Sequence, residues 1–251
     1  MANIFDYLDW RGDLSLLDSE FNEIDNLILA RFSYFPFDNI LKEGEEITIA
    51  EAGRRFKALD IEKERILQKE DIDLFPKMAE SKRFSEMKIA NYINKISPEE
   101  EKQFSSVTIF MPDDTMYISF RGTDNTLIGW KEDFNMSFKE NVPSQLDAVE
   151  YVNKIANEYT NKIRIGGHSK GGNLAVYSAS FCNEEIQDRI ISVYNNDGPG
   201  FHETITKNPN YRKIIPKVHT LIPQTSIIGR LLYHEESYTV VQSTEKRCYA
   251  T

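Results

Sequence analysis

Apolar residues in the first third of the chain recur every three or four positions, which is the spacing of one face of an α-helix. The recurrence is loose over residues 5–17 and clearer over residues 21–32. Pro36 follows closely, and because proline cannot continue a helix, we expect the second helix to end before it. The pattern therefore predicts two helices before residue 36.

The next stretch keeps the helical spacing. Residues 49–60 form a further expected helix, with Thr48 as its N-cap because the threonine hydroxyl accepts a hydrogen bond from a first-turn amide. Charged residues crowd positions 60–73, which is typical of a solvated helix face, and more helix is expected over residues 74–94. Residues 1–100 are thus predicted to form a mostly helical region that caps or flanks the rest.

From residue 104 the pattern changes to short runs of β-branched and aromatic residues, which are typical of strands. The expected strands cover residues 104–111, 115–120, 163–165, 190–194, 217–222 and 238–242. We further expect a loop over 121–130, a short helix over 131–139 and an amphipathic helix over 144–159. Because the later strands alternate with helices, the sequence predicts an α/β fold with a mostly parallel sheet. We expect one domain over 1–251, with residues 101–251 as its sheet core.

Residues Gly167-His-Ser-Lys-Gly171 match the nucleophile-elbow motif G-x-S-x-G. A strand-like run precedes the motif and a small-residue, helix-compatible run follows it. In this setting the turn strains the backbone of Ser169 and exposes its hydroxyl at a strand end, where the helix N-terminus favours negative charge. Ser169 is therefore the predicted nucleophile, and the alternative is a tight glycine-rich turn with an idle serine.

Acyl transfer by a serine also needs oxyanion donors and an acid that orients a base. The backbone N–H of Lys170 is one expected donor, and Thr123, in a loop where Gly122 permits close approach, is the second. Asp197 follows the strand after the elbow and is the expected acid. The alternatives are a plain turn at Thr123 and an Asx-type turn at Asp197.

The base is the hardest residue to assign, because none of the four histidines has an obvious position. We expect His168 to be structural, His219 to pack in the core, and His202 to lie too close to Asp197 in the chain. His234 has the right order after Ser169 and Asp197, so it is the candidate base. A serine–lysine pair is less favoured, because we expect the Lys170 side chain to point outward.

Composition narrows the classes of partner. The chain has 251 residues and a net charge of −10, which argues against unaided binding of nucleic acid or an anionic membrane. It contains no run of about 18 apolar residues, and its N-terminus lacks the features of a secretion signal. Cys182 and Cys248 suit free thiols in a reducing cytoplasm. No cluster has metal-ligand spacing, and we expect no cofactor.

The motifs together resemble a bacterial lipase-like family related to the class 3, fungal-type triacylglycerol lipases. The stretches that carry the resemblance are residues 120–124, 130–133, 166–175, 196–201, 222–236 and 238–241, with 3–12 and 21–29 near the N-terminus. The resemblance covers almost the whole chain. It implies an α/β-hydrolase fold, Ser169 as nucleophile, and Thr123 with Lys170 at the oxyanion hole.

The sequence departs from this pattern in two places. Class 3 lipases carry their acid in a segment that resembles residues 222–226, where this chain has no carboxylate, and Asp197 instead resembles the acid of pancreatic-type lipases. The family's catalytic histidine lies beyond the segment that resembles residues 238–243, where this sequence has none. Three explanations stay open: the natural chain extends past Thr251, the site is incomplete, or His234 serves as base.

Two functions follow from these observations. The first is a serine carboxylic-ester hydrolase of esterase or lipase type, acting on a small-molecule or lipid acyl ester, with thioesterase or acyltransferase activity as variants of the same chemistry. The second is a catalytically impaired hydrolase fold that serves as a binding or scaffold protein. The elbow and the loop at Thr123 favour the first, and the missing histidine favours the second. The sequence leaves the oligomeric state open.

Overall fold

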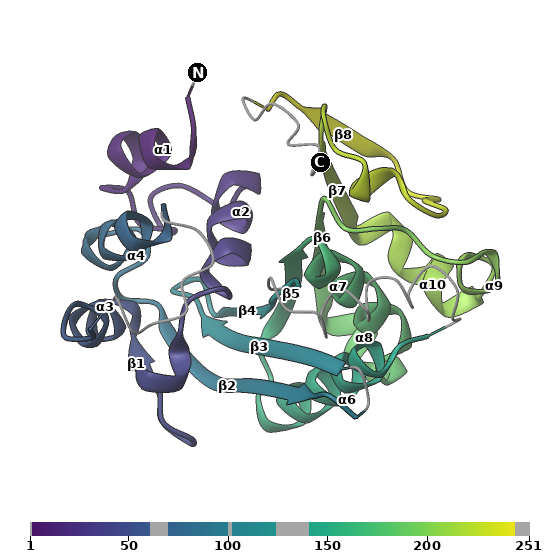
Figure 1. The fold of residues 1–251 in the computed structure, drawn as a ribbon, viewed down its shortest axis with the longest axis horizontal. Coiled ribbons are helices and arrows are strands. Elements are labelled where there is room, and N and C mark those ends of the chain that lie inside the picture. Colours follow the sequence, from purple (N-terminus) through teal and green to yellow (C-terminus); the bar gives the residue numbers. More distant parts are fainter. Residues whose placement is uncertain (1, 61–69, 100–101, 124–140, 244–251) are drawn as a thin grey trace.

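A computed structural model describes residues 2–60, 70–99, 102–123 and 141–243. Within these ranges one mixed sheet runs through the molecule, and its strands lie in the order in which they occur in the chain (Figure 1). The strands are β1 (Ile47–Thr48), β2 (Lys88–Ser97), β3 (Lys102–Phe110), β4 (Thr115–Phe120), β5 (Lys162–His168), β6 (Ile190–Asn196), β7 (Val218–Pro223) and β8 (Tyr238–Val241).

The sheet changes direction at β4. Strands β1 to β4 pair antiparallel, and β4 to β8 pair parallel. Phe120 lies opposite Gly167, and His168 lies opposite Asn196. The carboxyl ends of β4, β5 and β6 therefore meet at one edge of the sheet, which is where ligands bind in open α/β sheets.

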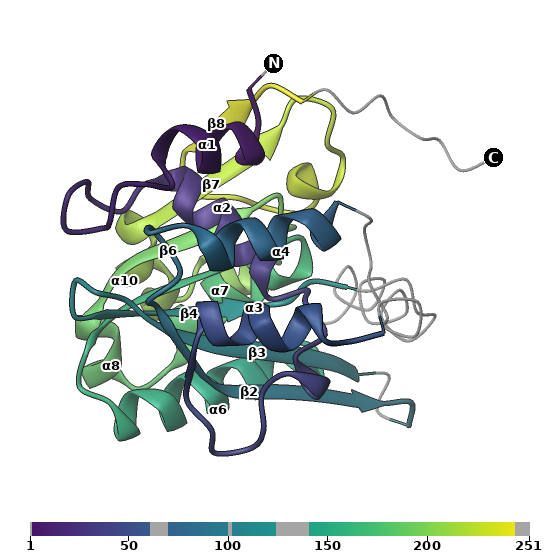
Figure 2. The ribbon, with the colours of Figure 1, turned by 90° about the vertical axis from the view of Figure 1, so that its left-hand side faces the viewer.

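Helices cover both faces of the sheet (Figures 1 and 2). The N-terminal helices form one layer: α1 (Ile4–Arg11), α2 (Glu23–Phe32), α3 (Ile49–Lys57) and α4 (Asp71–Glu80). On the other side lie α6 (Pro143–Glu158), α7 (Lys170–Phe181), α8 (Glu184–Arg189), α9 (Glu203–Thr206) and α10 (Pro209–Ile214). No helix among the described residues is both long enough and apolar enough to cross a bilayer.

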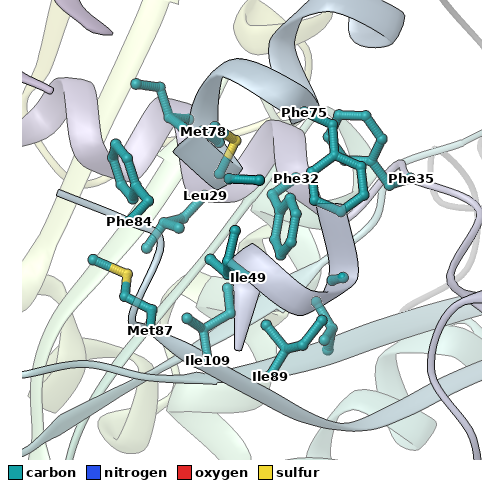
Figure 3. Packing of buried hydrophobic residues seen from close by; sticks show 14 of the residues in the cluster. Leu29, Phe32, Phe35, Ile49, Phe75, Met78, Phe84, Met87, Ile89 and Ile109 are labelled. Carbon is teal, nitrogen blue, oxygen red and sulfur yellow. The ribbon is translucent and has the colours of Figure 1, made fainter. Parts of the chain in front are cut away.

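Each face of the sheet carries its own apolar core, because successive strand side chains point to opposite faces. On β4, Tyr117 packs with the N-terminal helices, whereas Met116 and Ile118 pack with α6 and α7. In the first core, Phe32 and Phe75 stack edge to face, with ring centroids 5.2 Å apart (Figure 3). The N-terminal layer is therefore packed directly on the sheet.

Helix α2 is the central element of the N-terminal layer. Its N-cap, Asn22, accepts hydrogen bonds from the amides of Ile24 and Asp25, while the Asp25 carboxylate accepts one from the Asn22 amide. Asp25 also forms a fully buried ion pair with Arg83. These bonds fix where α2 begins, and with it the residues that α2 presents to β4, β5 and β6.

Most of the elements expected from the sequence are present. The mostly parallel α/β sheet is confirmed, as are the helices over 21–32 and 144–159 and the strands from residue 104 onward. Helix α3 begins at Ile49, and the Thr48 hydroxyl accepts from the Glu51 amide at 3.1 Å, as an N-cap should. The N-terminal helices flank one face of the sheet.

The expectation of helix over 74–94 is wrong beyond Glu80, because β2 begins at Lys88. Parts of the stretch 60–73, and the loop and helix expected over 124–139, lie outside the described residues. Cys182 is buried, and burial raises the pKa of its thiol to about 12, whereas Cys248 lies outside the described part of the chain.

Candidate active site

The turn between β5 and α7 has the strained geometry expected of a nucleophile elbow. Ser169 has φ 56° and ψ −129°, a conformation that residues with a side chain rarely adopt. A Cβ built on Gly167 would lie 2.4 Å from the backbone of Gly171, so only glycine permits this contact between strand and helix. Ser169 is half-buried at the sheet edge where β4, β5 and β6 end.

The buried side chains of Asn196 and Asn26 support the elbow through hydrogen bonds. Asn196, the last residue of β6, accepts the Ser169 amide with its carbonyl at 2.9 Å and donates its side-chain amide to the Gly167 carbonyl at 3.0 Å. Asn26 of α2 donates to the Asn196 side chain at 2.8 Å and accepts from the Tyr117 hydroxyl at 2.8 Å. The strained turn is therefore held by both the sheet and the N-terminal layer.

The loop after β4 lies directly against the elbow. A Cβ built on Gly122 would lie 3.3 Å from the Ser169 Cβ and 2.5 Å from the His168 carbonyl oxygen. Gly122 is thus required for this close approach, and Thr123 is the next residue. The structure brings the loop of Thr123 and the first turn of α7, which starts at Lys170, to the same place as Ser169.

The Lys170 side chain does not point outward, which corrects the sequence expectation. It is 1% exposed, and its Nζ donates to the Gln103 carbonyl of β3 at 2.8 Å. The physical reason is that every residue of α7 from Lys170 to Ser180 is buried, so the helix has no solvent-facing side there. Lys170 is tied to β3.

Asp197 follows β6 at the same edge and also has a positive φ, 59°. Its amide donates to the Leu221 carbonyl of β7 at 2.8 Å, and its Oδ1 accepts from the Gly229 amide at 3.1 Å. Burial raises the pKa of the carboxyl, opposed by hydrogen bonds from Ser226 and Gly229. Asp197, which directly follows β6, is therefore hydrogen-bonded through its carboxylate to the segment that follows β7.

His234 forms a buried pair with a carboxylate that sequence reasoning missed. Its Nδ1 lies 2.9 Å from the Glu236 Oε1, and the two side chains are 8% and 3% exposed. The Thr220 hydroxyl donates to Glu236 at 2.8 Å. Burial opposes ionisation of Glu236, but the hydrogen bonds from His234 and its other partners outweigh it, so the pKa of Glu236 is lowered. The adjacency His-Glu-Glu at 234–236 was the available signal.

Within the described residues, His234 is not hydrogen-bonded to Ser169 or to Asp197. Its Nε2 is buried without a hydrogen-bond partner, and its Cδ2 lies 3.0 Å from where a Cβ on Gly200 would stand. Among the described residues no hydrogen bond joins this ring to the Ser169 hydroxyl or to the Asp197 carboxylate. The described hydrogen bonds therefore do not connect Ser169, Asp197 and His234 into a triad.

Two of the other histidines, His168 and His219, occupy different settings. His168, expected to be structural, lies with its Nδ1 3.0 Å from the Tyr34 hydroxyl. Burial, reinforced by the charge of Arg31, lowers the pKa of His168 to about 4, so it is neutral at physiological pH. His219 is exposed and stacks on Tyr194 at 5.1 Å, so the expectation that it packs in the core is wrong. It occupies an outward-facing position of β7.

A groove of about 740 Å³ lies away from the elbow. It runs along β2 beside Asn94, between Asp38 on one side and Asp147 of α6 on the other. None of Ser169, Thr123, Asp197 and His234 lines it. Within the described residues no three His, Cys, Asp or Glu side chains gather as metal ligands.

Comparison with known proteins gives a family. The sequence profile of the Mbeg1-like family matches residues 78–249, which is more than half of the chain. The chain belongs to the Mbeg1-like family. A search of curated proteins found no match. The strand–elbow–helix arrangement of this Mbeg1-like chain, on a mostly parallel sheet covered on both faces, is that of the α/β-hydrolase fold.

Solved structures with similarity to this Mbeg1-like chain include two lipases. The Rhizomucor miehei lipase–propeptide complex has 16% identity and a TM-score of 0.48, and the match covers 63% of this chain and 58% of that one. M37 lipase has 15% identity and a TM-score of 0.49, with 84% and 70% covered. The chain thus spans less than two thirds of the length of the Rhizomucor lipase.

Proposed function

We propose that this Mbeg1-like chain is a serine ester hydrolase of lipase or esterase type, with Ser169 as its nucleophile. The observation that carries the proposal is the backbone of Ser169, a non-glycine residue held at φ 56° between a strand and a helix N-terminus. Such strain persists only where the surroundings enforce it, and it is common at active sites. Here Asn196 and the Gly122 loop enforce it.

The oxyanion of the reaction would form between the loop and the helix. As the Ser169 Oγ attacks an ester carbonyl, its proton passes to the base and the carbonyl oxygen becomes negative. We propose that the Lys170 amide and Thr123 donate to that oxygen. The alkoxide then leaves with the proton from the base, and water releases the acyl group from Ser169 in the same way. The substrate class is an acyl ester, with a lipid ester inferred from the family resemblance.

The base in this proposal is His234, and the acid is either Asp197, as the sequence suggests, or Glu236. Glu236 already accepts a hydrogen bond from the Nδ1 of His234 and so orients the ring, which is what the acid of a triad does. For His234 to act, its partnerless Nε2 must reach the Ser169 hydroxyl. One observation favours the second function, a hydrolase fold used for binding. Among the described residues, no base forms a hydrogen bond with the Ser169 hydroxyl.

Labelling with a fluorophosphonate probe, followed by intact mass, tests the nucleophile. We expect one adduct on the native chain, none on Ser169→Ala, and an unchanged adduct on Ser178→Ala. Ser178 is the matched control because it lies two turns along the same helix, with its hydroxyl bonded to the Ala175 carbonyl. An adduct that persists in Ser169→Ala would overturn the nucleophile assignment.

The same labelling assay tests the roles of the candidate base and of the two candidate acids. If His234 is the base, His234→Ala should slow labelling by roughly 10²-fold or more, within the range of general-base contributions. Asp197→Asn and Glu236→Gln then show which carboxylate orients the ring. A native chain that takes no label, while remaining folded by circular dichroism, would favour the binding function.

A further inference from the structure

Tyr34 lies at the junction of the elbow, the loop after β4 and the N-terminal layer. Its hydroxyl is 3.0 Å from the His168 Nδ1 and 3.3 Å from the His168 carbonyl oxygen. It is also 2.2 Å from where a Cβ on Gly122 would stand. The hydroxyl therefore occupies the space that the missing side chain of Gly122 leaves, between the two backbone segments that flank Ser169.

The protonation of this junction follows from its geometry. Tyr34 has one hydroxyl proton and two partners on His168. Both hydrogen bonds form when Nδ1–H donates to the phenolic oxygen and the hydroxyl donates to the His168 carbonyl. A neutral ring protonated on Nδ1 satisfies this arrangement. The bridge then fixes the main chain immediately before Ser169 as well as the ring.

Tyr34 is itself held from behind. It is 7% exposed, and the guanidinium of Arg31 lies 5.0 Å from its ring centroid. Arg31 in turn pairs with Asp71 through two hydrogen bonds of 2.7 Å each. A cation over a tyrosine ring and a two-pronged ion pair both restrict movement. The hydroxyl is thus presented to the elbow by a rigid support that begins on α4.

We propose that Tyr34 is a positioning residue that sets the separation between the Gly122–Thr123 loop and the elbow, and so the width of the oxyanion hole. This inference rests on the proposed function, and it gives a residue of the N-terminal layer a part in shaping the active site. Tyr34 acts through His168 and Gly122. Without the hydroxyl, the loop loses its spacer, and the Thr123 donor shifts relative to the Lys170 amide.

Tyr34→Phe tests the proposal, because it removes only the hydroxyl. We expect the rate of fluorophosphonate labelling and kcat for p-nitrophenyl acetate to fall about tenfold, with KM changed less than about twofold, since loss of an oxyanion donor acts on the transition state. Tyr7→Phe is the matched control: Tyr7 is another buried tyrosine of the N-terminal layer, and its hydroxyl donates to Asp25 at 2.9 Å, away from the elbow.

Amide hydrogen exchange supplies a second readout that needs no activity. We expect residues 120–123 and 168–172 to exchange faster in Tyr34→Phe and to be unchanged in Tyr7→Phe. Labelling at the native rate in Tyr34→Phe, or equal losses in both variants, would overturn the positioning role and leave Ser169 as nucleophile. If the native chain takes no label, the proposed function fails, and the exchange comparison alone decides whether Tyr34 positions the loop.

Discussion

At the scale of single residues, Ser169 and Asp197 share an unusual backbone conformation. Ser169 and Asp197 both have a positive φ, and they lie at the ends of adjacent parallel strands. The G-x-S-x-G motif predicted the strained turn at Ser169, and the position directly after a strand predicted that Asp197 lies at the same sheet edge; their roles in catalysis stay predictions. Both predictions rest on local chain geometry, which the sequence expresses directly.

Other residues of the site could not be predicted, because their partners are distant in the chain. Tyr34 and His168 are 134 positions apart, and nothing near Tyr34 in the sequence indicates that contact. The direction of Lys170 depends on β3 covering the start of α7, which local helical spacing does not reveal. The role of Glu236, in the loop before β8, likewise depends on Thr220 of β7.

His168 should make the protein less stable in mild acid. Its pKa is about 4 in the folded state and near 6.5 when unfolded, so the unfolded chain takes up the proton first as pH falls. The free energy of unfolding should therefore decrease from about pH 6.5 to pH 4, by up to about 3 kcal/mol. Urea denaturation across this pH range should show that the free energy of unfolding depends less steeply on pH in His168→Gln than in the native protein. Equal pH dependence in both proteins would contradict the assignment.

At the scale of elements, β2 shows how a strand can resemble a helix. Its apolar residues Ile89, Ile93 and Ile96 follow the spacing of a helix face. The cause is a bulge between Ala90 and Ile93, where Asn91 has φ 55° and shifts the register. An inserted residue breaks the alternation of a strand, so spacing alone predicted the wrong element. Strands without a bulge, such as β3 and β4, were predicted correctly.

The attachment of α2 depends on one buried ion pair. Asp25 and Arg83 are fully buried, so Asp25→Asn leaves an arginine charge without compensation and should cost about 3–5 kcal/mol of unfolding free energy. Asp18→Asn is the matched control, because Asp18 pairs with Lys82 at 3.0 Å on the surface; this substitution should lower the free energy of unfolding far less. Chemical denaturation of both variants measures the difference. Similar losses would mean that the buried pair does not hold α2.

At the scale of the whole molecule, the sheet joins two cores into what we propose is a single domain. Tyr117 of β4 belongs to the N-terminal core, while its neighbours Met116 and Ile118 belong to the other. Neither face of the sheet is complete without its helical layer. In this proposal, the change from helical spacing to strand-like runs near residue 100 therefore marks the passage from the N-terminal helical layer to the sheet core, and not a boundary between two domains.

Removal of the N-terminal layer should therefore prevent cooperative folding. A fragment of residues 101–251 would expose Val107, Ile109 and Tyr117, which are at most 1% exposed in the whole chain. We expect the full chain to unfold in one transition by near- and far-ultraviolet circular dichroism, and the fragment to bind a hydrophobic dye and show no cooperative transition. A sharp unfolding transition of the fragment would indicate two independent domains.

The bond between Asn26 and Asn196 joins residues 170 positions apart, and this separation has a consequence for synthesis. At the usual pace of translation, the ribosome needs roughly 10–30 s to add that many residues. During this interval the apolar side of α2 has no finished sheet to cover. The nascent chain should therefore engage chaperones after its first helices emerge, and release from them should coincide with the appearance of β6.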